Sequence, residues 1–266
     1  MLIATWNVNG IRARVGQLLD WTRAERPDVV CLQEIKAAPD QIPNALKYDD
    51  DYWTYWHGGK GYSGVALLVR KAWAPVVPTF EHPAFDMETR IVTTRLTAAS
   101  DREGGRTRSM LVASVYVPNG GKDYEAKLRF FRDLVAFAAH ARDLGHDLVV
   151  CGDLNIAHRE IDVHPKERKA LGIGQRTEER QLFDDLLATG LVDLCRHHDP
   201  ENDGLFTWWP PWRNMRQRNI GWRIDYLLAS SGLLPAFDTS TVHATVGTSD
   251  HAPVAIRLAL RQTAQS

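Results

Sequence analysis

The stretch LVVCGDLN, residues 148–155, is the segment from which we interpret the rest of the chain. Its apolar first half is typical of a buried strand, and Gly152 permits close approach of another backbone or of a substrate. Because side chains alternate along a strand, we expect Asp153 and Asn155 on the same side of its end. Polar groups at the end of an apolar strand are normally paired or used for chemistry. A turn or a helix cap explains this pair about equally well.

Similar strand-like runs recur along the chain and are bounded by Gly, Pro or Asp. We expect strands over residues 2–8, 28–34, 52–57, 64–70, 90–97, 110–117, 148–153, 223–229, 241–246 and 252–260. We expect helices over residues 12–25, 123–144 and 177–188, the last with Thr177 as its N-cap, and a shorter one within residues 36–47 that Pro39 and Pro43 interrupt. Because several strands follow one another directly, the pattern favours an α/β sandwich over strict βαβ winding. Residues 101–108, 158–175 and 197–221 are long polar connections, which are either functional or variable surface.

The composition places the chain among ordinary globular proteins. Its 266 residues, 44% of them hydrophobic, are expected to form one domain, 1–266, with a packed core. The net charge of −1 excludes a protein that coats nucleic acid by bulk charge, but it permits a local basic stripe. The three cysteines, Cys31, Cys151 and Cys195, include no CxxC pair, so we expect buried free thiols in a reducing compartment and no structural zinc. We find no signal peptide and no apolar run near the roughly 20 residues that span a bilayer. We therefore expect a cytoplasmic monomer with no membrane association.

Two motifs near the N-terminus carry polar groups at predicted strand ends. Asn7 and Asn9 lie in WNVNG, residues 6–10, and alternation predicts that they point the same way. Two amides at this position suit a metal or a phosphate, although Asn-Gly is also the commonest turn pair. Glu34 ends the apolar run of residues 31–33, and a strand-end glutamate is a plausible ligand for a hard metal ion. The simpler interpretation is a rim carboxylate paired with Lys36.

Two motifs near the C-terminus combine acids with a histidine. Asp250 and His251 are adjacent just before the last predicted strand, where they suit either an Asx-type turn or proton sharing near neutral pH. Asp225 lies inside the otherwise apolar run of residues 224–228 and must have a partner if buried. We predict that this partner is His251, because an Asp–His pair fixes the tautomer of the ring and keeps it protonated.

Together these motifs predict a site for a hard divalent cation. Glu34, Asp153 and Asp250, with the amides of Asn7 and Asn155, supply the oxygen ligands that Mg²⁺ uses. Zinc is disfavoured because the set is oxygen and amide with a single imidazole.

The segment FTWWPPWRNMRQR, residues 206–218, interleaves aromatic side chains with arginine. Arginine can hold phosphates while a ring stacks or wedges beside an unpaired position. For any single tryptophan here, Trp209 above all, a core position is about as probable as a surface role.

These motifs resemble, nearly end to end, the exonuclease III branch of the endonuclease/exonuclease/phosphatase superfamily. The resemblance rests on WNVNGIR (residues 6–12), LQE (32–34), GYSGV (61–65), YVPN (116–119), GDLNIAH (152–158), RID (223–225) and SDH (249–251), in family order. It implies a four-layer αββα sandwich with two mixed β-sheets flanked by helices, and the motifs converging at one rim. It implies a nuclease that cuts phosphodiesters 5′ to abasic sites and removes nucleotides or blocking groups from 3′ ends of duplex DNA.

The resemblance also implies roles for the acidic and amide residues. Glu34 would bind Mg²⁺, or Mn²⁺ as a substitute, with Asn7 and Asp250 close by. Asp153 would orient or deprotonate the attacking water and would be held by Asn155.

Three further residues would act on the scissile phosphate. His251, braced by Asp225, would contact it, and Tyr116 would lie beside it. The sequence leaves open whether Tyr116 acts as a phenolate or as a hydrogen-bond donor.

The resemblance further implies which residues meet the DNA. Trp208 and Trp212 are the wedge candidates, and Trp222 would line a pocket for the base-free sugar. Asn9 stands where some members of the family carry Asp, so we give it a supporting role. Secondary contacts are expected from Arg12, Lys36, Lys122 and the basic residues within 166–169, each of which also fits a solvated surface charge.

Two other functions remain open at this point. A phosphomonoesterase of the same superfamily would share the metal site, but the Trp/Arg segment and the form of the motifs argue against it. A non-catalytic binding module for damaged DNA would keep the fold, but no expected catalytic position is vacated. The sequence does not fix the balance of abasic endonuclease, 3′ exonuclease, 3′-phosphatase and RNase H-like activities.

Overall fold

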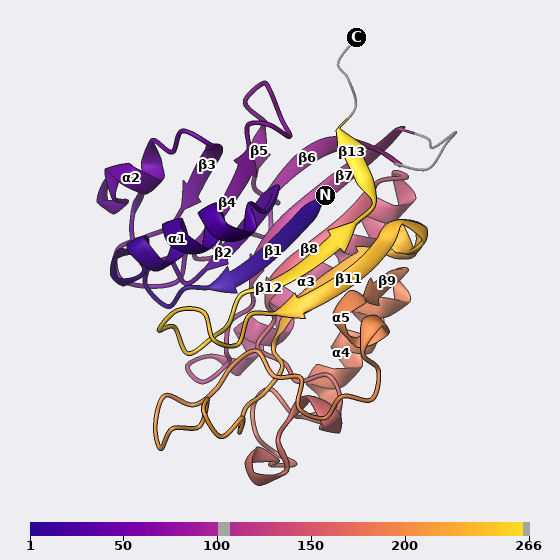
Figure 1. Cartoon of the computed structure of the whole chain (residues 1–266). Coiled ribbons are helices and arrows are strands. Elements are labelled where there is room, and N and C mark those ends of the chain that lie inside the picture. The colour runs from indigo at the N-terminus through magenta and orange to yellow at the C-terminus, as the bar shows by residue number, and fades with distance from the viewer. Residues whose placement is uncertain (101–106, 263–266) are drawn as a thin grey trace.

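Two mixed β-sheets lie face to face in the computed structural model, which describes residues 1–100 and 107–262 (Figure 1). The first sheet has the order β11 (Phe237–Val242), β12 (Val254–Leu258), β1 (Leu2–Asn7), β2 (Val29–Gln33), β4 (Val65–Arg70), β3 (Tyr52–His57). The second has the order β13 (Leu260–Gln262), β6 (Ile91–Ser100), β7 (Thr107–Tyr116), β8 (Asp147–Asp153), β10 (Asp225–Ser230), β9 (Leu191–Asp193), and β5 (Phe80–Glu81) pairs with β6.

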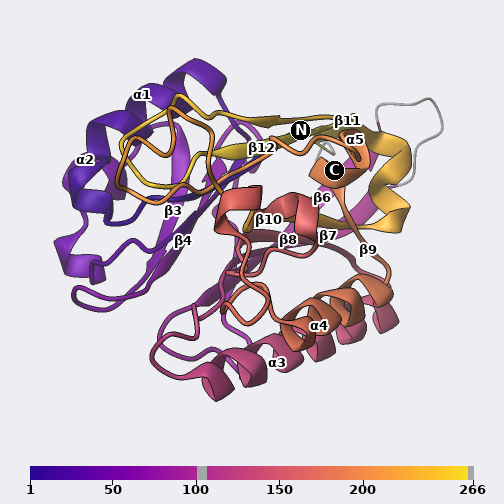
Figure 2. The same ribbon diagram turned by 90° about the horizontal axis from the view of Figure 1, so that it is seen from below.

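Helices cover both outer faces of this pair of sheets. Figure 2 places α1 (Val15–Glu25) and α2 (Asn44–Lys47) on one side, and α3 (Tyr124–Asp143) and α4 (Thr177–Ala188) on the opposite side. The short helix α5 (Leu194–His198) contacts β11 and β10. The remaining helical turns are 3₁₀ segments, at Ile11–Ala13, Pro39–Gln41, Glu160–Asp162, Pro165–Glu167 and Ser231–Ala236. The predicted αββα sandwich is confirmed.

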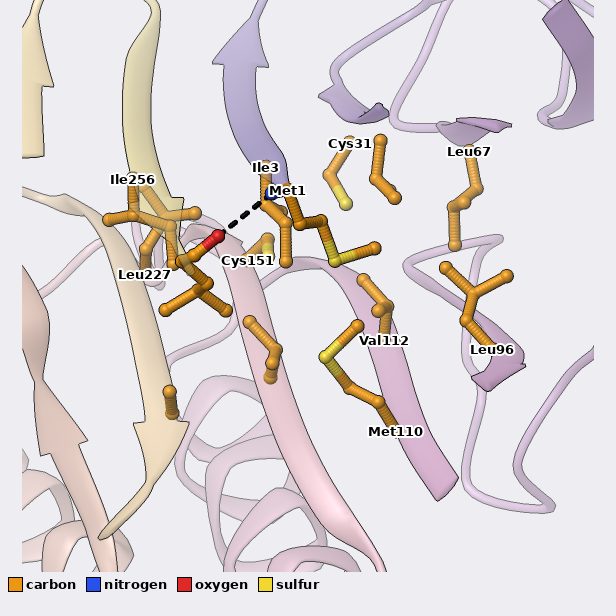
Figure 3. Close-up of a cluster of buried hydrophobic side chains, with 14 of the residues drawn as sticks. Met1, Ile3, Cys31, Leu67, Leu96, Met110, Val112, Cys151, Leu227 and Ile256 are labelled. Carbon is orange, nitrogen blue, oxygen red and sulfur yellow. Dashed lines mark hydrogen bonds between the residues drawn. The ribbon is translucent and has the colours of Figure 1, made fainter. Parts of the chain in front are cut away.

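Side-chain alternation explains why the strands stack in this way. In β1, Ile3 faces the core between the sheets, whereas Leu2, Ala4 and Trp6 face the core beneath α1. The inter-sheet core joins apolar residues of both sheets (Figure 3). It includes the buried free thiols of Cys31, Cys151 and Cys195. A third core lies beneath α3 and α4. The expectation of buried cysteines without disulfides is therefore met among the described residues.

Gly152 is required by the close approach of β7 to β8. Its φ of 153° and the position of its backbone mean that a Cβ atom would lie 1.8 Å from the carbonyl oxygen of Val115. The close approach predicted at this glycine is therefore that of a neighbouring strand.

Several predicted boundaries were wrong. The first helix starts at Val15, after the 3₁₀ turn Ile11–Ala13. Thr177 is the first helical residue and not the cap: Arg176 holds that position, and its backbone N–H donates to Glu179 Oε2 at 3.1 Å. The strand predicted from residue 223 starts at Asp225, because the backbone N–H of Arg223 donates to Asp162 O.

The C-terminal strands also differ from the prediction. Residues 241–246 were expected as a strand, but β11 spans Phe237–Val242. The strand predicted over residues 252–260 is two strands in different sheets, β12 and β13, because the chain crosses from the first sheet to the second at Ala259. The strands β5 and β9 and the helix α5 were not predicted. Of the long connections, residues 158–175 and 197–221 contain only short elements, and residues 101–106 of the segment 101–108 lie outside the described residues.

No helix within residues 1–100 and 107–262 is both long and apolar enough to traverse a bilayer.

Candidate active site

Five strands bring the predicted polar residues to one rim of the sandwich. The parallel pairs β1–β2 and β7–β8 end together there, with Asn7 opposite Gln33 and Tyr116 opposite Asp153. The antiparallel strand β10 begins at the same rim, because Asp225 pairs with Asp153. The long loops that follow β8 and precede β10 extend beyond this rim at the bottom of Figure 1. A cleft of about 370 Å³ opens among them, lined by Glu34, Tyr116, Asn119, Gly121, Asp153, Asn155, Ile173, Trp208, Trp222, Ile224, Asp250 and His251. A larger hollow of about 610 Å³ beside α1 and α2 contains none of these side chains.

Asn7 ties the two carboxylates of the cleft together. Its Nδ2 donates to Glu34 Oε1 at 2.9 Å and to Asp153 Oδ2 at 2.9 Å, while its Oδ1 accepts from the backbone N–H of Asn9 at 3.0 Å. Ligand atoms of Glu34, Asp153 and His251 all lie within 4.8 Å of one another. The first and last of these residues lie more than a hundred positions apart in the sequence, yet all three form one cluster, as the sequence predicts.

Asp153 is the most deeply buried acid of this cluster. Its Oδ1 accepts from the backbone N–H of Asn155 at 2.9 Å. Burial raises the pKa of Asp153 to about 7. The negative charges of Asp225 and Glu34 add to this increase, and the positive charge of His251 opposes it. A carboxyl group tuned to this range can gain or lose a proton near neutral pH.

His251 is held as a cation by Asp225. Its Nδ1 donates to Asp225 Oδ2 at 2.9 Å. Burial favours the neutral ring, but Asp225, Asp153 and Asp250 together raise the pKa of His251 to about 10. The opposite ring atom, Nε2, lies 3.9 Å from Asp153 Oδ2, beyond hydrogen-bond distance, and faces the cleft. The predicted Asp225–His251 pair is present.

Thr207 supports this pair and was missed as a single residue, although it lies inside the quoted aromatic segment. Its hydroxyl donates to Asp225 Oδ2 at 2.6 Å and accepts from the backbone N–H of Ile224 and of Asp225, each at 3.1 Å. Thr207 thereby fixes the carboxylate that orients the ring of His251.

Asp250 lies beside the cluster and is held by two donors. Asn9 Nδ2 donates to Asp250 Oδ1 at 2.8 Å, and the indole Nε1 of Trp208 donates to Asp250 Oδ2 at 2.9 Å. Trp208 is therefore a lining residue of the cleft, in edge contact with Trp222 at 5.7 Å between ring centroids, and does not project as a free wedge.

Glu34 is paired with Lys36, as the simpler interpretation of the sequence predicted. Lys36 Nζ lies 2.7 Å from Glu34 Oε2 and donates to Asn9 Oδ1 at 2.6 Å. Burial opposes ionisation, but the hydrogen bonds from Asn7 and Lys36 outweigh it and lower the pKa of Glu34. Glu34 is therefore ionised at neutral pH, and a cation would compete with Lys36 for it.

The site residues after the strands adopt left-handed backbone conformations. The φ angles of Asn9, Glu34, Lys36 and Asn155 are 44°, 50°, 50° and 52°. A turn of the chain thus brings Asn9 to Asp250 and places Asn155 in the wall of the cleft. The argument from strand alternation was wrong for both pairs, and the turn interpretation that the sequence left open fits instead. Such conformations are costly for residues other than glycine and concentrate at functional sites.

Comparisons with known proteins settle the family. The family model described as "Endonuclease/Exonuclease/phosphatase family" matches residues 4–251. The chain belongs to this family. DNA repair nuclease APEX1 of Danio rerio is 35% identical over 98% of this chain and 83% of its own length. Exodeoxyribonuclease of Bacillus subtilis is 32% identical over 96% of this chain and 98% of its own. The solved 3′-5′ exonuclease of Neisseria meningitidis is 31% identical and superposes with a TM-score of 0.83 over 97% of this chain and 99% of that one.

These relatives place the chain in the exonuclease III branch of the endonuclease/exonuclease/phosphatase family, as the motifs predicted. It is a hydrolytic nuclease of the DNA repair type.

In this family member, Tyr116 is packed against an arginine that sequence reasoning missed. The buried guanidinium of Arg90 lies 4.8 Å from the centre of the Tyr116 ring, and its Nη2 donates to the hydroxyl of Tyr62 at 2.7 Å. Burial, together with Glu34 and Asp153, raises the pKa of Tyr116 well above its usual value. Tyr116 is therefore a neutral phenol at neutral pH in this arrangement. No motif marked Arg90, because its role depends on two rings from other segments.

A buried ion pair behind Asn155 was also missed. Lys127 Nζ lies 2.5 Å from Glu179 Oε1 and donates to the backbone oxygen of Asn155 at 2.7 Å. The side chain of Asn155 donates from Nδ2 to Val117 O at 2.9 Å. The loop that carries Asn155 is thus fixed from two sides. Lys127 and Glu179 lie on expected helices, but their pairing is a tertiary contact that helical periodicity does not reveal.

The remaining predicted contact residues are spread over the surface around the cleft. Trp222 is partly buried and lines the cleft, and Trp212 is exposed, with 55% of its surface accessible. Arg12 and Lys122 are exposed, and Trp209 is buried, as its core interpretation predicted.

The donor set fits a hard divalent cation. Because His251 is held as a cation, the ligands left to a metal are the carboxylate and amide oxygens of Glu34, Asp153 and their neighbours. Mg²⁺ and Mn²⁺ prefer oxygen ligands, and the negative charge of the two neighbouring acids attracts a cation.

Proposed function

We propose that this chain is a Mg²⁺-dependent nuclease, with Mn²⁺ as a substitute, that cuts duplex DNA 5′ to abasic sites and removes nucleotides or blocking groups from 3′ ends. The observation that carries the proposal is the placement in one cleft of Asp153, whose pKa is raised to about 7, next to His251, which is protonated at neutral pH, and the ionised Glu34. A proton acceptor, a positive charge beside the phosphate and a metal ligand are three functions that together catalyse phosphodiester hydrolysis.

In the proposed reaction, a water molecule attacks the phosphorus while Asp153 accepts its proton. The backbone N–H of Asn155 and the amide of Asn7 hold the two oxygens of Asp153 in place for this step. A bond forms between the water oxygen and phosphorus, the bond from phosphorus to the 3′ oxygen breaks, and that oxygen leaves as a hydroxyl after taking up a proton. His251 Nε2 and the phenol of Tyr116 donate hydrogen bonds to the phosphate oxygens, which carry more charge in the transition state.

A divalent cation bound to Glu34 would polarise the phosphate and stabilise the leaving oxygen. We propose Glu34 as its principal ligand, with Asn7, Asp153, Asn155 and Asp250 nearby in supporting positions. Asn7 would swing or rotate its amide to present an oxygen, since its Nδ2 now bridges the two acids.

We propose that DNA is held by residues around the cleft. Trp222 and Trp208 would enclose a base-free sugar, Trp212 would contact the duplex from its exposed position, and Asn9, Arg12, Lys36 and Lys122 would meet phosphates. Because phosphate contacts release counterions, affinity should fall steeply with salt. The basic residues within 166–169 are proposed to add to this effect.

The cellular setting is also proposed. Residues 1–266 would form a single catalytic domain that acts as a monomer. The three buried free thiols favour the reducing cytoplasm.

The proposal is tested by product analysis on end-labelled duplexes that carry an abasic site, a recessed 3′ end or a 3′-phosphate, beside a soluble phosphomonoester. We expect Mg²⁺-dependent cleavage of the duplexes, abolished by chelator and by D153N. Turnover of the phosphomonoester alone would identify a phosphatase, and binding without cleavage in Mg²⁺ would identify a non-catalytic module.

A further inference from the structure

Outside the acidic cleft, a second cluster of ligand-bearing side chains lies at the end of β3. His57 is the last residue of β3, His82 follows β5, and Asp86 lies in the connection to β6. Ligand atoms of these three residues all lie within 4.8 Å of one another. Neither the motifs nor the nuclease mechanism uses any of them.

Backbone groups orient the side chains of Asp86 and His82, and Asp86 in turn orients His57. Asp86 Oδ1 accepts from the backbone N–H of Arg90 at 2.8 Å and of Ile91 at 3.1 Å, which leaves Oδ2 to meet His57 Nε2 at 2.5 Å. His82 Nδ1 lies 3.2 Å from the backbone oxygen of Ile91. A carbonyl oxygen only accepts, so Nδ1 carries the hydrogen, and in the neutral ring Nε2 holds a lone pair.

This arrangement is the usual environment of a metal-binding imidazole. Such rings donate from one nitrogen to a backbone carbonyl or a carboxylate, which fixes the tautomer and aims the other nitrogen at the ion. His82 Nε2 now accepts from the hydroxyl of Tyr55 at 2.8 Å, a contact that an ion would replace.

The cluster is accessible and can adjust. The side chains of His57 and Asp86 are 20% and 12% exposed, and His82 is an exposed residue. The two imidazole rings stack with centroids 3.8 Å apart and planes 30° from parallel. Ligand atoms around a tetrahedral ion with bonds of about 2.0–2.2 Å lie roughly 3.4 Å apart. The contact between His57 and Asp86 must therefore lengthen by about 1 Å, which a half-exposed cluster permits.

We propose that His57, His82 and Asp86 form a second metal site, separate from the acidic cleft, that takes a divalent transition-metal ion of the imidazole-preferring class, with Zn²⁺ as its representative. Two imidazoles and one carboxylate favour such ions over Mg²⁺, whose preferred ligands are oxygens. Water would complete the coordination sphere.

The position of the site indicates what an ion would do there. His57 precedes the loop of residues 58–64, which carries Tyr62, and Asp86 is bonded to the backbone of Arg90. Arg90 donates to the Tyr62 hydroxyl and packs on Tyr116. An ion at the site would fasten the two segments that bring Tyr62 and Arg90 together, and would stiffen this wall of the cleft.

The test measures zinc bound by the metal-free full-length chain in excess Mg²⁺, by competition with a chromophoric zinc chelator. We expect wild type to bind one zinc ion per chain more than H57A or H82A does. E34Q, which alters the acidic cleft, and H197A, which removes an exposed histidine on α5, should retain that ion. Thermal denaturation should show zinc stabilising the wild type but not H82Q, a milder change at an exposed position.

Equal zinc binding by wild type and both histidine variants would overturn the proposal, and so would loss of the ion in E34Q alone. Co²⁺ offers a second readout, because a tetrahedral site gives visible absorption bands that H82A should lack. The proposal does not depend on the nuclease assignment, since zinc binding is measured without DNA.

Discussion

Neutralising Asp225 with D225N is the sharpest test of how the cleft holds its positive charge. Among the charges that raise the pKa of His251 to about 10, Asp225 is the largest contributor, while burial opposes the charged ring. The difference from the ordinary value of 6.5 corresponds to about 5 kcal/mol, at roughly 1.4 kcal/mol for each pH unit. Without Asp225, we expect the pKa of His251 to fall toward or below 6.5, so that the ring is largely neutral at pH 7.5.

Two consequences follow from this change. Because the pKa of His251 is higher in the folded chain than in the unfolded chain, binding of the proton to this ring stabilises the fold. This contribution is fully present below about pH 6.5, the pKa of the ring in the unfolded chain, and is lost as the pH rises through about 10. D225N should therefore lower the free energy of unfolding near pH 7 by up to about 4 kcal/mol, because about three of the pH units between 6.5 and 10 lie above that pH. Cleavage should fall on the order of 10²–10³-fold, as for removal of one fixed donor to a developing oxyanion.

The assay pairs NMR titration of the His251 imidazole with single-turnover cleavage of an abasic duplex. The matched control is D184N, which removes the carboxylate partner of His158 at an exposed Asp–His pair with a 2.7 Å contact. The control should cleave at the wild-type rate. The reasoning would be refuted if D225N kept a His251 pKa near 10, or if it cleaved as fast as D184N.

Three further results are expected. D153N should melt at a higher temperature than wild type at pH 8 when no metal is present. The pKa of Asp153 is raised to about 7, so ionisation of this carboxyl group destabilises the fold as the pH rises from about 4 through about 7, and an amide avoids that cost. An unchanged or lower melting temperature of D153N at pH 8 would contradict this. G152A should lose several kcal/mol of stability in denaturant unfolding, because its Cβ would overlap the oxygen of Val115, whereas G16A, on α1 with open space around it, should gain about 0.5–1 kcal/mol. E34Q should need a higher Mg²⁺ concentration for half-maximal cleavage in a metal titration, and an unchanged requirement would remove Glu34 from the metal site.

Features that depend on local sequence could be predicted. The apolar run before Asp153 predicted an acid at the end of a buried strand, and the resemblance to exonuclease III predicted that the motifs converge at one rim; the parallel pairs β1–β2 and β7–β8 end there together. The Asp225–His251 pair followed from the rule that a buried acid requires a partner.

The rest depends on contacts between distant segments. Thr207, Arg90 and Lys127 act through side chains or carbonyl groups that the fold alone brings near them. The left-handed turns at Asn9 and Asn155 override strand alternation, and they correspond to the turn interpretation that the local sequence left open at both places. The division of residues 252–260 into two strands, with the chain crossing to the second sheet at Ala259, could likewise not be inferred from a continuous apolar run.

The central claim is that a divalent cation bound at Glu34, beside Asp153, contacts the scissile phosphate of DNA. The most direct test replaces a nonbridging oxygen of that phosphate by sulfur and compares single-turnover cleavage in Mg²⁺ and Mn²⁺, since sulfur binds the hard Mg²⁺ ion poorly. We predict that one phosphorothioate isomer is cleaved slowly in Mg²⁺ and recovers in Mn²⁺. An equal effect of sulfur in both metals, for both isomers, would contradict direct contact between the cation and the phosphate.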